Sequence, residues 1–282
     1  MNEERIRSCR PEDRPALKAL WKQAFGDEDA YIDRFFDSFP PEGTGLAAEA
    51  EGKPVSAMYP LSDIRLYPYR QEVLTAGYAY ALATLPEYRG RGIGRRVYRA
   101  LSDRILETCD AACVLPAEES LYPFYETAAG AKVLSYVREV RVSREELRGV
   151  TPCPGARLPA YQYAGVRQSL LAGMPHAALS EAYYDFLEAD EGTEFFVLEG
   201  GVAATETPES GVCRITELLA PDADPLAAIA GVARWQPARE YIVRTPLFYR
   251  GLGDARPYML AVLAKEPDFP MPRDLWWGFG LD

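Results

Sequence analysis

Histidine is almost absent from this sequence, which has only His176 among its 282 residues. Any mechanism that needs a histidine cluster is therefore excluded, and so are most zinc sites. The five cysteines are odd in number and follow neither metal-ligand nor disulfide-framework spacing. We therefore expect a protein with reduced thiols and no bound metal.

Long apolar segments are also missing. No run of about 18 apolar residues could form a transmembrane helix. The charged first residues, MNEERIRSCRPEDR, lack the apolar core of a signal peptide. We expect a soluble, cytoplasmic protein that does not bind a membrane.

Positive charge is in deficit. Asp and Glu number 42 against 31 Lys and Arg, which gives a formal net charge of −11. Proteins that bind nucleic acid usually present a basic face, so we expect no nucleic-acid partner. An acidic protein tends to attract cationic partners such as amines, although net charge is weak information about any single site.

The length and the 48% of hydrophobic residues suffice for two domains, each with its own core. Residues 147–158 contain two prolines and two glycines and are predicted to form a linker. This division places a first domain at residues 1–146 and a second domain at residues 159–282.

Hydrophobic periodicity predicts alternating helices and strands in both domains, which is an α/β class. In the first domain we expect strands at 4–9, 45–50, 54–67, 73–85, 111–115 and 135–142, and helices at 11–25, 27–39, 93–108 and 121–128. In the second we expect helices at 179–187 and 225–235, and strands at 194–198, 202–205, 212–219, 241–244 and 258–263. The order in the second domain echoes the end of the first, so one interpretation is a degenerate copy.

The basic residues of this acidic chain concentrate in the stretch PEYRGRGIGRR, residues 86–96, between a predicted strand and a predicted helix. Backbone N–H groups at a helix N-terminus lack intrahelical partners, and glycines let a phosphate oxygen approach them closely. Flanking arginines add charge-assisted hydrogen bonds. The stretch therefore indicates a pyrophosphate cradle. The alternative is a tight turn whose helix carries a solvated basic face.

The spacing fits neither of two common phosphate loops. A P-loop needs Gly-x4-Gly-Lys-[Ser/Thr], which does not occur here. A dinucleotide fingerprint that starts at Gly90 and Gly92 would need a third glycine where Arg95 stands. The remaining pattern is Arg89-x-x-Gly92-x-Gly94.

The stretch from Leu82 to Gly94, LATLPEYRGRGIG, resembles the acetyl-CoA motif of the GNAT superfamily of N-acetyltransferases, [Gln/Arg]-x-x-Gly-x-[Gly/Ala]. A second block, PAEESLYPFYE at residues 116–126, resembles the later helix of the family, where a tyrosine precedes a Gly-Phe pair. Here the pair is Gly130-Ala131, five residues after Tyr125 where four is usual. The resemblance covers roughly residues 3–145. The two-domain build is similar to the enhanced-intracellular-survival type of acetyltransferase, which is longer.

The resemblance implies a mixed sheet splayed between its fourth and fifth strands, with acetyl-CoA in the gap as cosubstrate. The backbone of Leu82 and Thr84 would pair with the pantetheine arm, and the amides from Arg89 to Arg95 would hold the pyrophosphate. The implied cofactor-binding set is Leu82, Ala83, Thr84, Arg89, Gly90, Arg91, Gly92, Ile93, Gly94 and Arg95.

The resemblance also implies direct attack of an amine on the thioester. A tyrosine can protonate the leaving thiolate at neutral pH. Tyr125 is the candidate general acid and Tyr122 the reserve, although both could instead belong to an aromatic core cluster. Because the first half has no histidine, the general base must be a carboxylate, a water chain or the substrate itself. Glu118 and Glu119 are the candidate carboxylates, or caps of the following helix.

Other residues have weaker signals. Tyr78 and Tyr80 could shape the acceptor site or be ordinary strand aromatics. His176 is expected to be a cap or a surface residue, and Trp276 and Trp277 to pack in a core or between domains. The second domain, without a glycine loop, is expected to bind no second CoA and to wall off part of the acceptor site, with residues 276–282 near the cleft.

The predicted activity is transfer of the acetyl group of acetyl-CoA to a primary amine of a small molecule or peptide. Polyamine, aminoglycoside, amino acid and protein amine all remain open as acceptors. The competing hypothesis is a non-catalytic CoA-binding protein with a regulatory or scaffold role.

Overall fold

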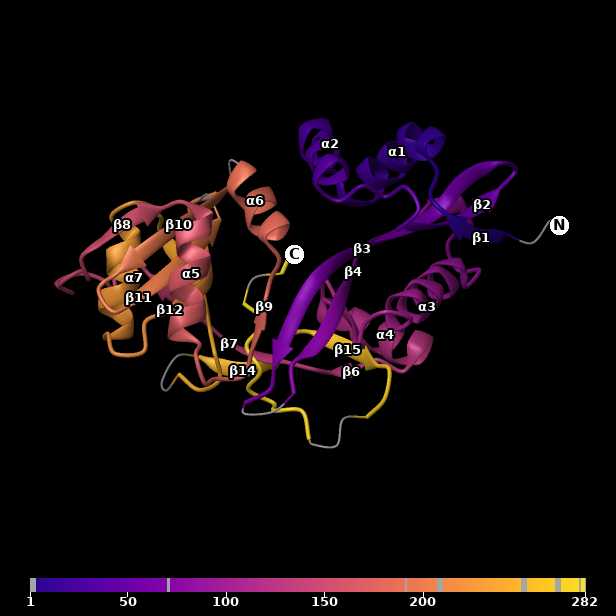
Figure 1. Ribbon diagram of the computed structural model, residues 1–282. Helices are drawn as coiled ribbons and strands as arrows, with labels where there is room; N and C mark the ends of the chain where they lie inside the picture. The colour runs from indigo at the N-terminus through magenta and orange to yellow at the C-terminus, as the bar shows by residue number, and fades with distance from the viewer. Residues whose placement is uncertain are drawn as a thin grey trace.

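The computed structural model describes residues 4–69, 72–190, 192–206, 210–249, 253–266, 270–278 and 280–281. They form two α/β lobes that lie side by side, each built around its own sheet (Figure 1). The mixed α/β class expected from the sequence is confirmed.

The first lobe contains most of the elements before residue 134. They are β1 (Arg5–Ser8), η1 (Pro11–Asp13), α1 (Arg14–Phe25), α2 (Asp29–Ser38), β2 (Leu46–Ala50), β3 (Lys53–Tyr67), β4 (Leu74–Thr84), η2 (Pro86–Tyr88), α3 (Ile93–Leu106), β5 (Ala111–Val114), η3 (Glu119–Leu121), α4 (Tyr122–Ala129), β6 (Lys132–Val133), β9 (His176–Ala178) and β15 (Leu260–Leu263). The strand order is β1-β2-β3-β4-β5-β15-β6, with β9 paired to β3. Among these pairs only β4 and β5 are parallel, and α3 makes the crossover between them.

Helices cover both faces of this sheet. Figure 1 shows α1 and α2 on one side of β3 and β4, and α3 and α4 on the other. The alternation of β3 explains the two layers, because successive side chains of a strand point to opposite faces. Tyr59 packs with Trp21 of α1, whereas the neighbouring Met58 belongs to the core cluster that contains Val97 of α3.

The second lobe has the strand order β14-β7-β13-β12-β11-β10-β8. Its elements are β7 (Tyr136–Ser143), β8 (Gly155–Leu158), α5 (Ala160–Leu170), α6 (Glu181–Ala189), β10 (Thr193–Leu198), β11 (Gly201–Glu206), β12 (Val212–Leu219), α7 (Pro225–Ala233), β13 (Glu240–Thr245) and β14 (Asp254–Pro257). The parallel unit β12–α7–β13 repeats the connection β4–α3–β5 of the first lobe. This repeat matches the echo noted in the sequence.

The two sheets exchange strands across the division expected at residues 147–158. The strand β7, expected in the first domain, pairs with β13 and β14 of the second sheet. The strand β15 returns to the first sheet and lies between β5 and β6. The last residues of the expected linker, Gly155–Leu158, form β8 and pair with β10. An alternating pattern predicts that a strand exists but does not say which sheet it joins.

The elements that escaped the sequence analysis include α5, β6, β8, β9 and β14. The helix α5 has Pro159 before it and only a narrow apolar stripe, so its periodicity is weak. The strands β9 and β14 are short. These segments are strands because each pairs with a strand from elsewhere in the chain, and local sequence does not show which segments will pair.

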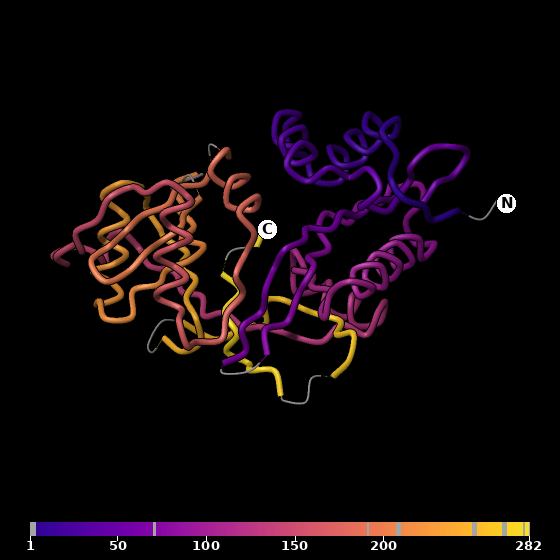
Figure 2. Tube along the Cα trace, viewed as in Figure 1, coloured from indigo at the N-terminus to yellow at the C-terminus, as the bar shows by residue number. Residues whose placement is uncertain are grey.

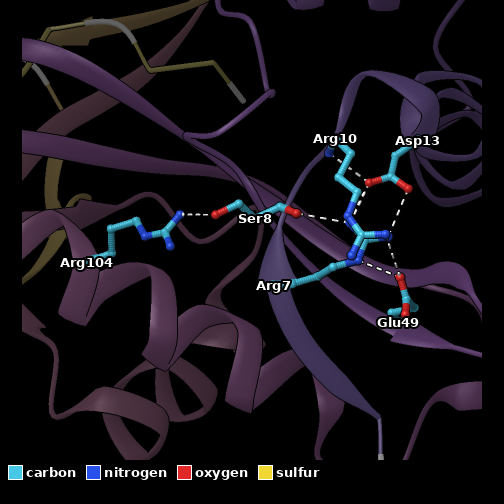
Figure 3. Close-up of polar contacts among 6 residues, drawn as sticks. All are labelled: Arg7, Ser8, Arg10, Asp13, Glu49 and Arg104. Atoms are coloured by element: carbon cyan, nitrogen blue, oxygen red, sulfur yellow. Dashed lines mark hydrogen bonds and ion pairs between the residues drawn. The ribbon is translucent and has the colours of Figure 1, made fainter.

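A charged cluster ties the first strand to its neighbours (Figure 3). The buried guanidinium of Arg7 donates to both carboxylate oxygens of Asp13, at 2.5 and 2.9 Å, and to Glu49 at 2.5 Å. The backbone amide of Arg10 also donates to Asp13, at 2.8 Å. These hydrogen bonds hold the pKa of Asp13 below its usual value. The cluster thereby joins β1, η1 and β2 beneath the N-terminus of α1.

We expect Asp13→Asn to destabilise the protein by about 2 kcal/mol at neutral pH, because it removes hydrogen bonds made to a charged group. The folded-state pKa of Asp13 is depressed, so its contribution is present above the unfolded-state pKa and is lost as the pH falls through the folded-state pKa. Denaturant unfolding of both proteins at several pH values checks this. A difference in unfolding free energy that stays constant down to pH 2 would contradict it.

Candidate active site

The first sheet opens between β4 and β5. The two strands pair only over Ala76–Tyr78 and Ala111–Cys113, whereas β4 continues to Thr84. Next to the point of separation the β3–β4 register shifts, and Ala81 has a φ of 55°, which marks a β-bulge. The predicted splay between the fourth and fifth strands is thus confirmed. It leaves one edge of β4 without a strand partner among the described residues.

A glycine loop leads from β4 into α3. Gly90 and Gly92 have φ values of 76° and 74°, a left-handed conformation that glycine adopts at little cost. The amide of Arg96 donates to the carbonyl of Gly92 at 3.1 Å. The amides between these two residues therefore lie in the first turn of α3, where no intrahelical acceptor exists. With the positive end of the helix dipole behind them, they are suited to an anion.

A pocket of about 640 Å³ lies against this loop. Except for Arg91, the whole predicted cofactor-binding set lines it: Leu82, Ala83, Thr84, Arg89, Gly90, Gly92, Ile93, Gly94 and Arg95. Aromatic side chains from three other segments complete the wall, namely Phe25, Tyr88 and Phe124. The single stretch from Leu82 to Arg95 therefore provides most of the lining of one cavity.

The loop arginines have different roles. Arg89 and Arg95 line the pocket, and the Nε of Arg89 also donates to the carbonyl of Thr84 at 2.9 Å. That bond occupies the carbonyl of Thr84, one of the two β4 residues whose backbone is expected to pair with a pantetheine arm. The guanidinium of Arg91 lies 5.0 Å from the ring centroid of Tyr88. Arg91 therefore packs against the loop itself and does not line the cavity.

The glycines are required for different reasons. At Gly90 and Gly92 an added Cβ would meet nothing within 4 Å, so only the backbone conformation favours glycine. At Gly94 the added atom would lie 3.2 Å from the Oγ1 of Thr84 and 3.8 Å from a methyl of Leu82. A larger side chain at Gly94 would push α3 away from β4 or fill the pocket between them.

A second pocket, of about 460 Å³, adjoins the first, and the two share Phe25 and Leu82. Both lobes contribute to it. From the first lobe come residues of β4, β5 and α4, including Tyr80 and Tyr125. From the second lobe come Leu187, Asp190, Thr193 and Glu206.

The sequence of the first lobe matches one protein family. Residues 5–128 match the model of the acetyltransferase (GNAT) domain. This match covers strands β1 to β5 of the splayed sheet, the glycine loop and α3. Residues 5–128 belong to the GNAT acetyltransferase superfamily.

The similarity to solved structures covers both lobes and is not limited to this GNAT domain. The GCN5-related N-acetyltransferase from Kribbella flavida is 17% identical, with a TM-score of 0.67 over 93% of this chain and 72% of that one. The GCN5-related N-acetyltransferase from Anabaena variabilis is 12% identical, with a TM-score of 0.69 over 93% and 73%. Eis1 from Mycobacterium abscessus is 12% identical, with a TM-score of 0.62 over 93% and 74%. At these identities the likeness is one of fold. None of the curated protein sequences matches this chain.

In the GNAT domain, Tyr125 lies where α4 faces the second pocket. Its ring packs edge-on against Tyr98 and Phe124, with centroid distances of 4.9 and 5.0 Å. Burial raises the pKa of the Tyr125 hydroxyl to about 12. The side chain thus belongs to the aromatic core cluster and also borders the pocket, so the two alternatives from the sequence are not exclusive.

The other tyrosines named from the sequence lie in different places. The hydroxyl of Tyr122 donates to the carbonyl of Tyr258 at 2.9 Å, and Tyr122 does not line either pocket. Tyr80 lines the second pocket, where its hydroxyl is 3.3 Å from that of Tyr31. Tyr78 is buried and packs against Trp277. Of these residues, Tyr80 alone is placed to contact an acceptor.

Glu118 and Glu119 are exposed at η3 and line neither pocket. The hydroxyl of Ser120 donates to Glu118 at 2.6 Å, and Glu119 is in the first turn of η3. Glu118 precedes η3 but makes no side-chain capping bond there, so only the first-turn position of Glu119 fits the helix-start alternative. The carboxylates that do border the second pocket are Asp27, Asp190 and Glu206. No sequence signal unites them, because folding brings them together from distant segments.

The end of the chain also reaches the second pocket. Figure 2 shows the C-terminal segment running between the two lobes. Gly280 and Leu281 line the pocket, and the amide of Gly280 donates to the hydroxyl of Tyr258 at 2.9 Å. Trp276 and Trp277 are fully buried, as expected for packing residues. The expected position near the cleft is confirmed for Gly280 and Leu281, whereas Phe279 and Asp282 lie outside the described residues.

The expectation for His176 is wrong. The side chain is 2% exposed and lies in β9, where its ring stacks on Tyr67 at a centroid distance of 4.8 Å. Its ring nitrogens bond the carbonyl of Met174 and the side chain of Gln168. Burial lowers its pKa. Its burial comes from β9 pairing with β3 across the two lobes, which the local sequence does not show.

Within the described ranges, no helix is both long and apolar enough to span a membrane. In the same ranges, no three His, Cys, Asp or Glu side chains gather where they could hold a metal ion.

Proposed function

We propose that this protein transfers the acetyl group of acetyl-CoA to a primary amine. One observation carries the proposal: the pocket against the glycine loop adjoins, at Phe25 and Leu82, a second pocket bordered by Tyr125 and by carboxylates. A site suited to a diphosphate, the open edge of β4 and a candidate proton donor thus lie next to one another. The family membership of residues 5–128 supports the same reaction class.

The residues of the first pocket fit acetyl-CoA. The amides of the first turn of α3 would bind the pyrophosphate, and Arg89 and Arg95 would add charge-assisted hydrogen bonds. The open edge of β4 offers backbone groups to the pantetheine amides. When bound, the cosubstrate supplies the acetyl thioester, whose carbonyl would lie near the junction of the pockets at Leu82.

The second pocket suits a cationic acceptor. Asp27, Asp190 and Glu206 border it, and carboxylates attract and orient an ammonium group. All three already have partners: Asp27 accepts from the indole of Trp21 at 2.7 Å, Asp190 pairs with Arg34 at 2.7 Å, and Glu206 pairs with Arg214 at 3.7 Å. The two arginines offset part of the charge of Asp190 and Glu206, whereas the partner of Asp27 is a neutral donor. The acceptor we infer is an amine that carries further positive charge.

In the reaction the unprotonated amine attacks the thioester carbon, the carbon–sulfur bond breaks, and the amine proton passes to solvent. The sulfur receives a proton from the Tyr125 hydroxyl, which is regenerated from water. A pKa near 12 keeps this hydroxyl protonated at neutral pH. The same burial would raise the pKa of the CoA thiol in the pocket, and this narrows the pKa difference between the Tyr125 hydroxyl and the thiol that receives its proton.

We expect Gly94→Val to weaken acetyl-CoA binding about 10–100-fold, the effect of losing one or two hydrogen bonds to a charged group. The added side chain would press on Thr84 and Leu82 and narrow the pocket. Isothermal titration calorimetry measures the change.

Two control variants sharpen this test. Gly165→Val also changes a helical glycine, but at an exposed site with nothing within 4 Å. Arg99→Ala removes an exposed arginine of α3 that does not line the pocket. Both should bind acetyl-CoA as the natural protein does. Similar small effects in all three variants would refute the cradle.

A further inference from the structure

The second lobe has a pocket of its own, of about 470 Å³, remote in sequence from the glycine loop. It forms where the connection after β7 meets the C-terminal end of α7 and the start of β13. Its lining shares no residue with the two pockets of the proposed active site: Arg144, Glu145, Leu147, Arg148, Val150, Pro152, Ala230, Ala233, Arg234, Arg239 and Tyr241.

Positive charge converges on this pocket in a chain whose net charge is −11. Four arginines line it, against the single carboxylate of Glu145. Glu145 pairs with Arg148 at 3.1 Å, and Arg239 donates to the carbonyl of Ser210 at 2.8 Å. Within the described part of the chain, Arg144 and Arg234 have no ion-pair partner. Like charges that lie close together repel each other, so an anion bound in the pocket would reduce the repulsion between the arginines.

The backbone holds the two sides of the pocket together. The amide of Arg144 donates to the carbonyl of Arg239 at 2.8 Å, which joins the connection after β7 to the start of β13. The Tyr241 hydroxyl donates to the carbonyl of Gln236 at 3.1 Å and accepts from the amide of Ala238 at 2.9 Å. The ring of Tyr241 is therefore fixed in the wall.

The floor between the arginines is apolar. Leu147, Val150, Pro152, Ala230 and Ala233 line it beside the Tyr241 ring. A volume of about 470 Å³ lies in the range of small-molecule sites. Guanidinium groups recognise carboxylate and phosphate oxygens through paired hydrogen bonds. The pocket thus combines an apolar surface with several anion-binding groups.

We propose that this pocket binds a small organic polyanion, one that carries two or more phosphate or carboxylate groups on an apolar body. Arg144 and Arg234 are the main anion contacts. The site is separate from the proposed acetyl-CoA site.

The test is calorimetric titration of the full chain with inorganic pyrophosphate and, separately, with citrate, in the presence of saturating CoA to fill the glycine-loop pocket. We expect saturable binding of at least one probe. The double variant Arg144→Ala/Arg234→Ala should weaken it about tenfold or more. The matched control Arg5→Ala/Arg65→Ala removes the same charge from two exposed arginines of the first lobe and should leave binding unchanged.

The outcomes separate this site from the proposed function. If CoA does not bind at the glycine loop, we expect pyrophosphate to fill both sites, and only one component of the titration should then depend on Arg144 and Arg234. Preference for pyrophosphate over citrate identifies phosphate as the ligand chemistry, and the reverse identifies carboxylate. If both double variants bound the probe equally weakly, the change in overall charge would explain the effect, and the proposal would be overturned. Absence of saturable binding for both probes would also overturn it.

Discussion

Replacing Tyr125 by Phe is expected to lower kcat about 10²–10⁴-fold, the usual contribution of a general acid. The ring packs against Tyr98 and Phe124 and would stay in place, because only the hydroxyl is removed. Fold and affinity for acetyl-CoA should therefore survive. Steady-state kinetics with saturating cosubstrate measures the loss. A marked fall in melting temperature would show instead that the hydroxyl serves packing.

The matched control is Tyr122→Phe, a neighbouring tyrosine on the same helix. Its hydroxyl donates to the carbonyl of Tyr258 and not into the pocket, so the variant should keep most of its turnover and lose about 1 kcal/mol of stability. In the natural protein, a Tyr125 pKa of about 12 predicts no loss of the proton donor up to about pH 10. A two- or threefold fall in kcat for Tyr125→Phe at unchanged stability would refute the assignment.

Arg167→Met is expected to destabilise the protein by about 3–5 kcal/mol, the usual effect of removing one partner of a buried ion pair. Arg167 and Glu217 are 1% and 0% exposed, and the Nε of Arg167 donates to Glu217 at 2.8 Å. The variant would leave the Glu217 carboxylate buried without its counter-charge. Chemical denaturation measures the change.

The same pair also fixes the wall of the acceptor pocket. Arg167 donates to the carbonyl of Ala177 in β9 at 2.8 Å and to that of Trp277 at 3.1 Å, while the indole of Trp276 donates to Glu217. These bonds place the C-terminal segment whose next residues line the second pocket. We therefore expect Arg167→Met to raise KM for the amine more than KM for acetyl-CoA.

Two further variants make this test decisive. In Arg167→Met/Glu217→Gln both charges are removed, so part of the stability should return. Arg141→Met breaks a pair with Glu240 whose arginine is 66% exposed, and should change stability little. If Arg167→Met behaved like Arg141→Met, the buried pair would have no role in holding the lobes and the C-terminal segment together.

Features encoded in adjacent residues were predictable from the sequence. The strand, glycines and helix between Leu82 and Arg95 are contiguous, and each has its own local signal, so nine of the ten residues predicted for the cofactor line the first pocket. Arg91 is the exception. Its guanidinium packs on the Tyr88 ring and does not line the cavity, and sequence does not show which of these positions a side chain takes.

Features assembled from distant segments were not predictable. Asp27, Asp190 and Glu206 come from segments far apart in the sequence, and contacts such as the pairing of β9 with β3 and the Arg34–Asp190 ion pair bring them to one pocket. The same long-range pairing buries His176. Glu118 and Glu119 were predicted from their position beside a strand end, which does not say whether a carboxylate faces a cleft or solvent; both are exposed and line neither pocket.

The most direct test of the account is to incubate the full chain with acetyl-CoA and a panel of amines, namely a polyamine, an aminoglycoside, amino acids and a lysine-containing peptide. Thiol release and the mass of the amine are followed together. The account predicts that at least one polycationic amine gains an acetyl group, with one thiol released for each amide formed. Binding of acetyl-CoA at the glycine loop without amine-dependent thiol release across the panel would contradict it and would indicate a non-catalytic CoA-binding protein.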